Sequence, residues 1–169
     1  ATAIFRSEKL IANYQRADGK QPAHIAGPIL DYGDASALDD LVVDVWANSS
    51  RQMAALARSN GIEYYHFLQP NQYHAGSKPL SQKEQALLLP EDHPGNAITR
   101  RIYPKLVAGI TRLAEDPDIA AFDVTQVYSG NEQTLYVDTC CHLNNEGYAI
   151  LARAVADRIA GTKTGTPAR

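Results

Sequence analysis

The sequence has few residues that could fix a fold by cross-links. Its 169 residues include only two cysteines, Cys140 and Cys141, and these are neighbours in the chain. A disulfide between adjacent cysteines is strained, which excludes the framework of a small disulfide-stabilised protein. We interpret both side chains as free, half-buried thiols, because free cysteine is among the most often buried residue types.

Long apolar runs and a strong excess of one charge are also absent. No apolar stretch approaches the roughly 20 residues that a membrane-spanning helix needs, so no membrane span is expected. The formal net charge of −3 provides no basic surface for nucleic acid, which is excluded as a partner. No secretory signal is visible. Because the chain begins at Ala1 instead of Met, we expect its start to come from processing, cloning or cleavage, and the compartment, export included, is left open.

What is present is sufficient for one folded domain. Hydrophobic residues make up 44% of the chain and charged residues 21%, as in ordinary globular domains. The length corresponds to about one domain, and no internal repeat or linker divides it. We therefore interpret residues 1–169 as a single domain. Residues 1–36 form an irregular lead-in, in which residues 1–16 could fold as a short amphipathic helix.

The middle of the chain has the pattern of a helix followed by a buried strand. A helix is predicted from a cap at Ser36 to Asn60–Gly61. Its apolar residues keep a near-3.6 period and share one face: Leu38, Leu41, Val42, Val45, Met53 and Leu56. Residues 62–68 are aromatic-rich and are stopped by Pro70, which is typical of a buried strand. Helix, glycine and strand in this order form half of an α/β crossover unit.

The second half of the chain continues this alternation. A single helical turn is predicted near residues 82–88, within a long surface excursion. A helix is predicted over residues 96–115, where Pro104 indicates a kink or a late start. A second strand is predicted at residues 120–125.

The last predicted helix has well-marked ends. Asn144 can cap it, Leu143 and Tyr148 can form a hydrophobic staple at its start, and Gly161 can close it. One face carries apolar residues at helical spacing: Tyr148, Leu151, Ala152, Val155 and Ile159.

The alternation of helices with strands predicts an α/β fold with an incomplete sheet. Only two strands are recognised, whereas a doubly wound sheet normally has four or more. We therefore expect the early strands to be missing. The open edge of such a sheet could pair with a second copy of the chain or with a different chain.

An acid and a histidine lie in the polar turn before the last helix. Asp138 follows the run Tyr136–Val137, which we expect to end a sheet, and His142 comes four residues after Asp138. A base and the carboxylate that orients it are two of the three parts of a nucleophilic hydrolase triad. Open α/β sheets place their ligands between a sheet end and a helix N-terminus. Asp138 and His142 are therefore the predicted catalytic residues.

A second polar loop follows the strand predicted at residues 62–68. Asn71 and Gln72 lie in it, and we predict that they bind substrate, because amide side chains at a strand end can line a pocket. The alternative is a loop that satisfies its own backbone, since asparagine is common in loops for turn geometry alone.

These motifs, taken in order, resemble the SGNH (GDSL-type) hydrolases. In that family a strand with an Asp-Leu/Val-Thr run leads through a loop to an Asp-x-x-His block before the last helix. Here Phe122-Asp123-Val124-Thr125 precedes the block from Tyr136 through Asp138 to His142-Leu143-Asn144, and residues 61–73 look like the preceding helix-to-strand unit. The resemblance covers about residues 37–160, the later (C-terminal) half of such a domain.

The resemblance implies a three-layer α/β/α flavodoxin-like fold and a serine esterase that acts on a small-molecule ester without a cofactor. In that chemistry His142 takes a proton from a serine, and Asp138 fixes the tautomer of the imidazole and stabilises the imidazolium.

The sequence departs from the family pattern in two ways. Three residues, not two, separate Asp138 from His142, and the family's early blocks with the nucleophilic serine and the oxyanion-hole asparagine are absent. The nearest match to the serine block is Tyr32-Gly33-Asp34-Ala35-Ser36, which contains an inserted alanine, and Ser36 is better explained as a helix cap. We therefore expect the nucleophile in a missing N-terminal part.

Two other interpretations stay open. The chain could be a catalytically inactive fragment or a binding module on the same fold. A metal site formed by Asp138, Cys140, Cys141 and His142 is disfavoured, because adjacent cysteines rarely close a tetrahedral zinc site. The alternative role for His142 is a turn histidine bonded to backbone, and we interpret His66, in the middle of a predicted strand, as a packed core residue.

Overall fold

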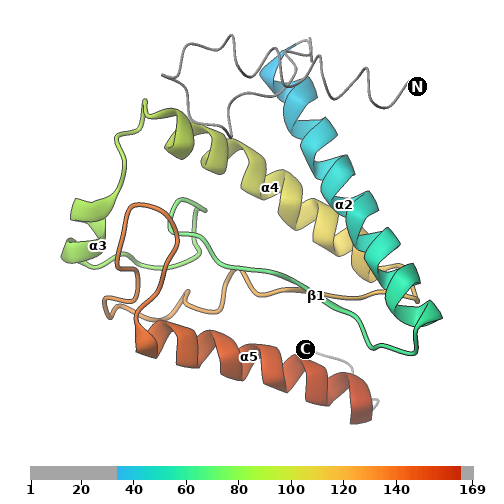
Figure 1. Cartoon of the computed structure of the whole chain (residues 1–169). Helices are drawn as coiled ribbons and strands as arrows, with labels where there is room; N and C mark the ends of the chain where they lie inside the picture. Colours follow the sequence, from blue (N-terminus) through green and yellow to red (C-terminus); the bar gives the residue numbers. More distant parts are fainter. Residues whose placement is uncertain (1–33, 165–169) are drawn as a thin grey trace, which may run out of the picture. The chain divides into compact units, whose positions relative to one another are not determined.

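A computed structural model describes residues 34–164 of the chain. The chain divides into two units, residues 1–33 and residues 34–169. The first unit lies outside the described residues, as does the helix expected within residues 1–16. The second unit is an α/β structure with the following element order (Figure 1): α2 (Ala35–Ser59), β1 (Tyr65–Leu68), α3 (Gln82–Leu87), α4 (Pro94–Ala114), β2 (Ala120–Asp123) and α5 (Asn145–Thr164).

Helix α2 begins at a different cap from the one that the sequence suggested. The side chain of Asp34 accepts a hydrogen bond from the backbone N–H of Ala37 (2.8 Å), so Asp34, not Ser36, is the N-cap. Ser36 lies in the first turn, and its hydroxyl oxygen accepts from Lys105 Nζ (3.2 Å). The helix ends at Asn60 as predicted, and Gly61 follows with a φ of +68°, a left-handed conformation that favours glycine.

The apolar face of α2 that the sequence pattern picked out is exposed. An apolar helix face ordinarily packs against a core, but here its large residues are 43–61% exposed: Leu41, Val42, Val45, Met53 and Leu56. The buried side of α2 instead carries Val43, Ala47 and Ala54. These small residues, together with Gly109 on α4, let the two helices approach closely, since a Cβ at Gly109 would lie 3.1 Å from the Trp46 ring.

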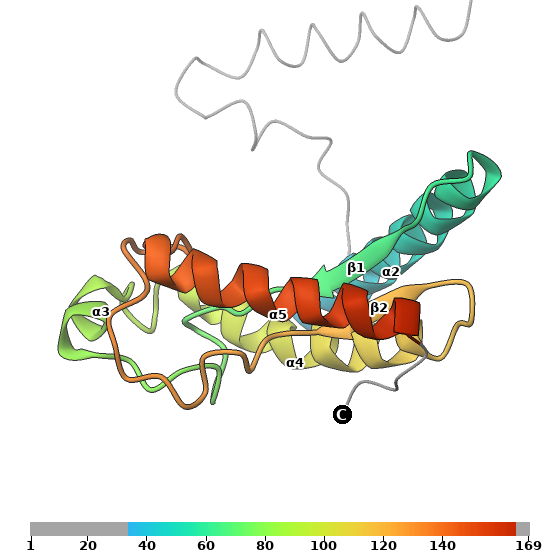
Figure 2. The ribbon, with the colours of Figure 1, turned by 90° about the horizontal axis from the view of Figure 1, so that it is seen from below.

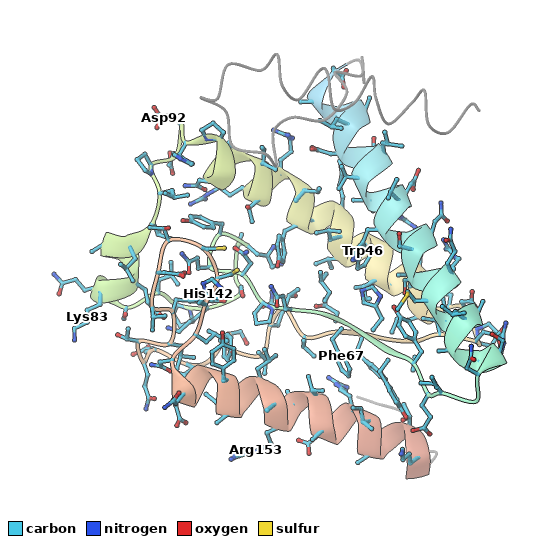
Figure 3. The ribbon with its side chains drawn as sticks, viewed as in Figure 1. Trp46, Phe67, Lys83, Asp92, His142 and Arg153 are labelled. Atoms are coloured by element: carbon cyan, nitrogen blue, oxygen red, sulfur yellow. The ribbon has the colours of Figure 1, made fainter. Side chains whose placement is uncertain are left out.

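The strands β1 and β2 form a two-stranded parallel sheet. Tyr65 pairs with Ala120, and the register continues to Leu68 and Asp123. Both strands are shorter than predicted. Side chains alternate between the two faces: Leu68 and Ala121 join the core formed with α2 and α4, whereas Phe67 and Phe122 stack on the other face with ring centroids 5.2 Å apart. The sheet lies between α4 and α5 in Figure 1, and Figure 2, seen from below, shows α5 in front of the sheet. Phe67 lies on the α5 side of β1 (Figure 3).

Helix α4 starts early and includes Pro104 in its interior. His93 caps it, because its Nδ1 accepts from the N–H of Gly95 (3.1 Å), and Pro94 occupies the first turn, where proline is favoured. Of the two alternatives predicted for Pro104, a kink or a late start, the late start is therefore wrong. The short helix α3 lies where one helical turn was predicted.

A second core supports the end of the chain. Tyr128, Leu135, Tyr136 and Leu143 are buried in it, with Ile150 and Leu151 of α5 packed against them. The expectation that Tyr136 belongs to a strand of the sheet is wrong. Tyr136 instead forms an isolated antiparallel bridge with Leu143. Asn144 caps α5 as predicted by accepting from the N–H of Gly147 (2.9 Å). The predicted end of the helix at Gly161 is wrong, because α5 continues past this residue to Thr164.

In the part of the chain that the structure describes, none of the helices combines the length and the apolar character required to cross a membrane.

His66 on β1 makes the stability of this unit depend on pH. Its Nδ1 lies 2.7 Å from Ser50 Oγ, and its ring meets Trp46 edge-on with centroids 4.8 Å apart. Burial lowers the pKa of His66 from its ordinary value of 6.5, because an imidazolium is costly to desolvate. Between the lowered pKa of folded His66 and about pH 6.5, the unfolded chain binds more protons than the folded chain. The contribution of neutral His66 to stability is therefore fully present above about pH 6.5 and is lost as the pH falls below that value.

We therefore expect urea unfolding to give a lower free energy of unfolding at pH 5.5 than at pH 7.5. His66→Gln keeps a polar group at this position but cannot titrate, so its loss between the two pH values should be smaller. An equal loss in both proteins would show that His66 is not responsible.

Candidate active site

The carboxylate of Asp138 is the centre of the turn before α5. Its Oδ2 contacts Nδ1 of His142. Its Oδ1 accepts from the backbone N–H groups of Cys140 (2.9 Å), Cys141 (3.2 Å) and His142 (3.3 Å). The hydrogen bond to His142 and those from the backbone hold the pKa of Asp138 below its ordinary value. Asp138 and His142 thus contact each other although three residues separate them, one more than in the Asp-x-x-His block.

The second ring nitrogen of His142, Nε2, has no hydrogen-bond partner among the described residues. The His142 side chain is 65% exposed, compared with 39% for Asp138. Among the described residues, only Nδ1 of the ring makes a hydrogen bond. A histidine held through Nδ1 by a carboxylate has the tautomer and orientation that a general base acting through Nε2 requires.

Residues from the loop after β1 hold this turn in place. Gln72 Nε2 donates to the carbonyl of Asp138 (3.1 Å), and the hydroxyl of Tyr73 donates to the carbonyl of Thr139 (2.6 Å). Tyr73 was not singled out from the sequence, where it is one of nine tyrosines. The turn is therefore fixed by groups 66 positions away in the chain.

The two predicted substrate-binding amides have different surroundings. Asn71 Oδ1 accepts from the N–H of Tyr73 (2.9 Å), as in a loop that satisfies its own backbone. Gln72 is 6% exposed, and within the described residues its Oε1 has no hydrogen-bond partner. The structure brings Gln72 to the turn of Asp138, and neither amide lines the pocket beside His142.

That pocket has a volume of about 170 Å³ and lies between the loop after β1 and the start of α5. Its lining combines polar and apolar side chains: Gln69, Pro70, Cys141, His142, Leu143, Tyr148 and Leu151. Sites for drug-sized ligands usually have volumes of about 300–1,000 Å³, so this pocket has room for a small chemical group only. None of these described lining residues is a serine.

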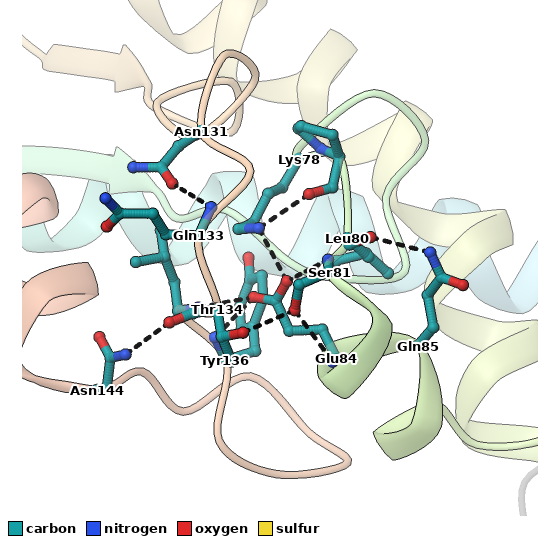
Figure 4. Close-up of polar contacts among 12 residues, drawn as sticks. Lys78, Leu80, Ser81, Glu84, Gln85, Asn131, Gln133, Thr134, Tyr136 and Asn144 are labelled. Atoms are coloured by element: carbon teal, nitrogen blue, oxygen red, sulfur yellow. Dashed lines mark hydrogen bonds and ion pairs between the residues drawn. The ribbon is translucent and has the colours of Figure 1, made fainter.

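A buried carboxylate on α3 anchors the segment that leads into the turn (Figure 4). Glu84 Oε1 accepts from the backbone N–H groups of Leu135 (2.8 Å) and Tyr136 (3.0 Å). Its Oε2 accepts from Lys78 Nζ (2.8 Å) and from the N–H of Ser81 (2.7 Å). Burial alone would raise the pKa of Glu84, but Lys78 and the backbone N–H groups lower it overall. Only the Ser-x-x-Glu capping pattern could have drawn attention to Glu84 in the sequence.

The two cysteines occupy the outer part of the turn. Cys140 is exposed, which corrects its prediction as half-buried, and Cys141 is half-buried. Burial and the neighbouring thiol of Cys140 raise the pKa of Cys141 to about 12. Within residues 34–164, no group of three or more His, Cys, Asp or Glu side chains could hold a metal ion.

Comparison with protein-family models, with curated proteins and with solved structures finds no match for this chain.

Proposed function

We propose that this chain is the later part of an SGNH-type serine ester hydrolase with a three-layer α/β/α flavodoxin-like fold. One observation carries the proposal: the Asp138 carboxylate is fixed by three backbone N–H groups and contacts Nδ1 of His142, whose Nε2 has no hydrogen-bond partner among the described residues. The arrangement of the sheet between α4 and α5 supports the fold (Figure 1).

In this proposal, Nε2 of His142 removes the proton from a serine hydroxyl as the serine oxygen bonds to the carbonyl carbon of an ester. Asp138 stabilises the resulting imidazolium, which then returns the proton to the departing alcohol oxygen. Water repeats the sequence to release the acid. The apolar side of the pocket, formed by Leu143, Tyr148 and Leu151, would hold a small apolar part of the ester.

The nucleophilic serine and the oxyanion donors would come from outside these residues, either from an earlier segment of a longer protein or from a second chain at the open sheet edge. This part of the proposal is supported by the lining of the pocket, which contains no serine among the described residues.

The test is labelling with a fluorophosphonate probe, which reacts with activated serines, followed by peptide mass analysis. We expect no serine adduct on the present chain, and an adduct in a longer protein that includes it. His142→Ala should abolish that adduct, whereas His93→Ala, at the exposed cap of α4, should leave it unchanged. Labelling that survives His142→Ala would contradict the assigned base.

The absence of a serine from the pocket lining also favours a second candidate, a non-catalytic binding module on the same fold. Failure of the probe to label either protein, with both folded, would favour that candidate.

A further inference from the structure

The two cysteine sulfurs of the turn are close enough to react with each other. Cys140 Sγ and Cys141 Sγ lie 3.0 Å apart, and both thiols are free. Cys140 is exposed, so a reagent in solution can reach it. The pair lies between Asp138 and His142, in the turn described above.

A bond between these sulfurs would be of the easily reduced kind. Neighbouring Cα atoms across a trans peptide are about 3.8 Å apart, whereas disulfides usually join Cα atoms about 4.4–6.8 Å apart. The short separation strains the bond. Strained and exposed disulfides are the labile or regulatory ones, in contrast to structural disulfides.

We propose that Cys140 and Cys141 are a modification site that forms a reversible vicinal disulfide by exchange with low-molecular-weight disulfides such as oxidised glutathione. The formation of this bond does not depend on the proposed hydrolase function.

The exchange proceeds in two balanced steps. The Cys140 thiolate attacks one sulfur of the small disulfide, forms a mixed disulfide and releases one thiolate. Cys141 then gives its proton to solvent and attacks Sγ of Cys140, which releases the second thiolate. Two protein thiols are oxidised, and one small disulfide is reduced to two thiols. Burial of Cys141 and its raised pKa slow the second step, whereas the 3.0 Å separation of the two sulfurs favours it.

Ring closure would act directly on the carboxylate of Asp138. The peptide that joins the two cysteines carries the N–H of Cys141, which donates to Asp138 Oδ1 (3.2 Å), and the N–H of Cys140 donates to the same oxygen (2.9 Å). Closure of the strained ring must rotate the peptide group between Cys140 and Cys141. Oxidation is therefore expected to weaken the hold on Asp138 and to disturb its contact with His142.

The experiment treats the folded chain with oxidised glutathione and follows its intact mass, its free thiols and the ¹⁵N resonances of the His142 ring at constant pH. We expect the loss of two hydrogen atoms and of both thiols, no retained glutathione, a shift of the His142 Nδ1 resonance, and full reversal by dithiothreitol. Cys140→Ser and Cys141→Ser cannot close the ring; each should keep at most a glutathione adduct and an unshifted His142 resonance.

Three outcomes would overturn the proposal: a glutathione adduct that persists on Cys140 of the unaltered chain, disulfide-linked dimers, or thiols that do not react. If the disulfide forms without any shift at His142, the coupling to the acid–base pair is wrong. Ester hydrolysis is not measured, so failure of the proposed function leaves the result unaffected.

Discussion

Replacing Lys78 with methionine is expected to lower the free energy of unfolding by about 3–5 kcal/mol, the usual loss when one partner of a buried ion pair is removed. Lys78 and Glu84 have side chains that are 0% and 1% exposed. Without the ammonium group, the carboxylate of Glu84 would be left with backbone N–H donors but no opposite charge. The measurement is urea unfolding at pH 7 followed by circular dichroism.

Two matched variants separate this effect from the loss of any lysine. Lys163→Met breaks an exposed ion pair, in which the side chain of Lys163 is 57% exposed and that of Glu63 is 64% exposed. It should lower the free energy of unfolding by at most about 1 kcal/mol. Adding Glu84→Gln to Lys78→Met removes the buried charge but keeps an oxygen for the N–H groups of Leu135 and Tyr136, so it should recover part of the loss. Similar small losses in Lys78→Met and Lys163→Met would contradict the importance of the buried pair.

The elements that the sequence predicted well are those determined by local chemistry. Asn144 caps α5 because its side chain reaches an N–H only three residues away. The contact between Asp138 and His142 spans four residues, so it too could be inferred from spacing. Gly61 ends its helix through its own backbone freedom.

What could not be predicted depends on contacts between distant segments. Glu84 binds the N–H of Leu135, 51 residues later, and nothing in the local sequence distinguishes this from an ordinary capping glutamate. The supporting bond from Tyr73 to the turn of Asp138 is of the same type. The exposed face of α2 shows the opposite case: periodicity identifies an apolar face, but which face packs against α4 was decided by the small residues Ala47 and Gly109.

Asp138→Asn is expected to reduce kcat for ester hydrolysis by about 10⁴-fold in the protein that also supplies the serine, the loss typical of a triad whose acid becomes an amide. An asparagine keeps Oδ1, which accepts the three N–H groups of the turn, so the turn should stay folded. The amide NH₂ that replaces Oδ2 cannot accept a hydrogen bond from the Nδ1–H of His142. The ring would then hold the wrong tautomer and could not act as a base through Nε2.

The matched control is Asp123→Asn at the end of β2. Asp123 Oδ1 accepts from the N–H of Thr125 (2.8 Å), so it makes the same kind of local turn bond, but no histidine among the described residues bonds to it. This variant should keep kcat within a few fold, and both variants should unfold at a similar urea concentration. The ¹⁵N shifts of the His142 ring, recorded on the present chain, should show Nδ1 protonated in the unaltered protein and Nε2 protonated in Asp138→Asn. If the tautomer changes but kcat does not, Asp138 orients a histidine that is not the base; if neither changes, Asp138 only closes the turn.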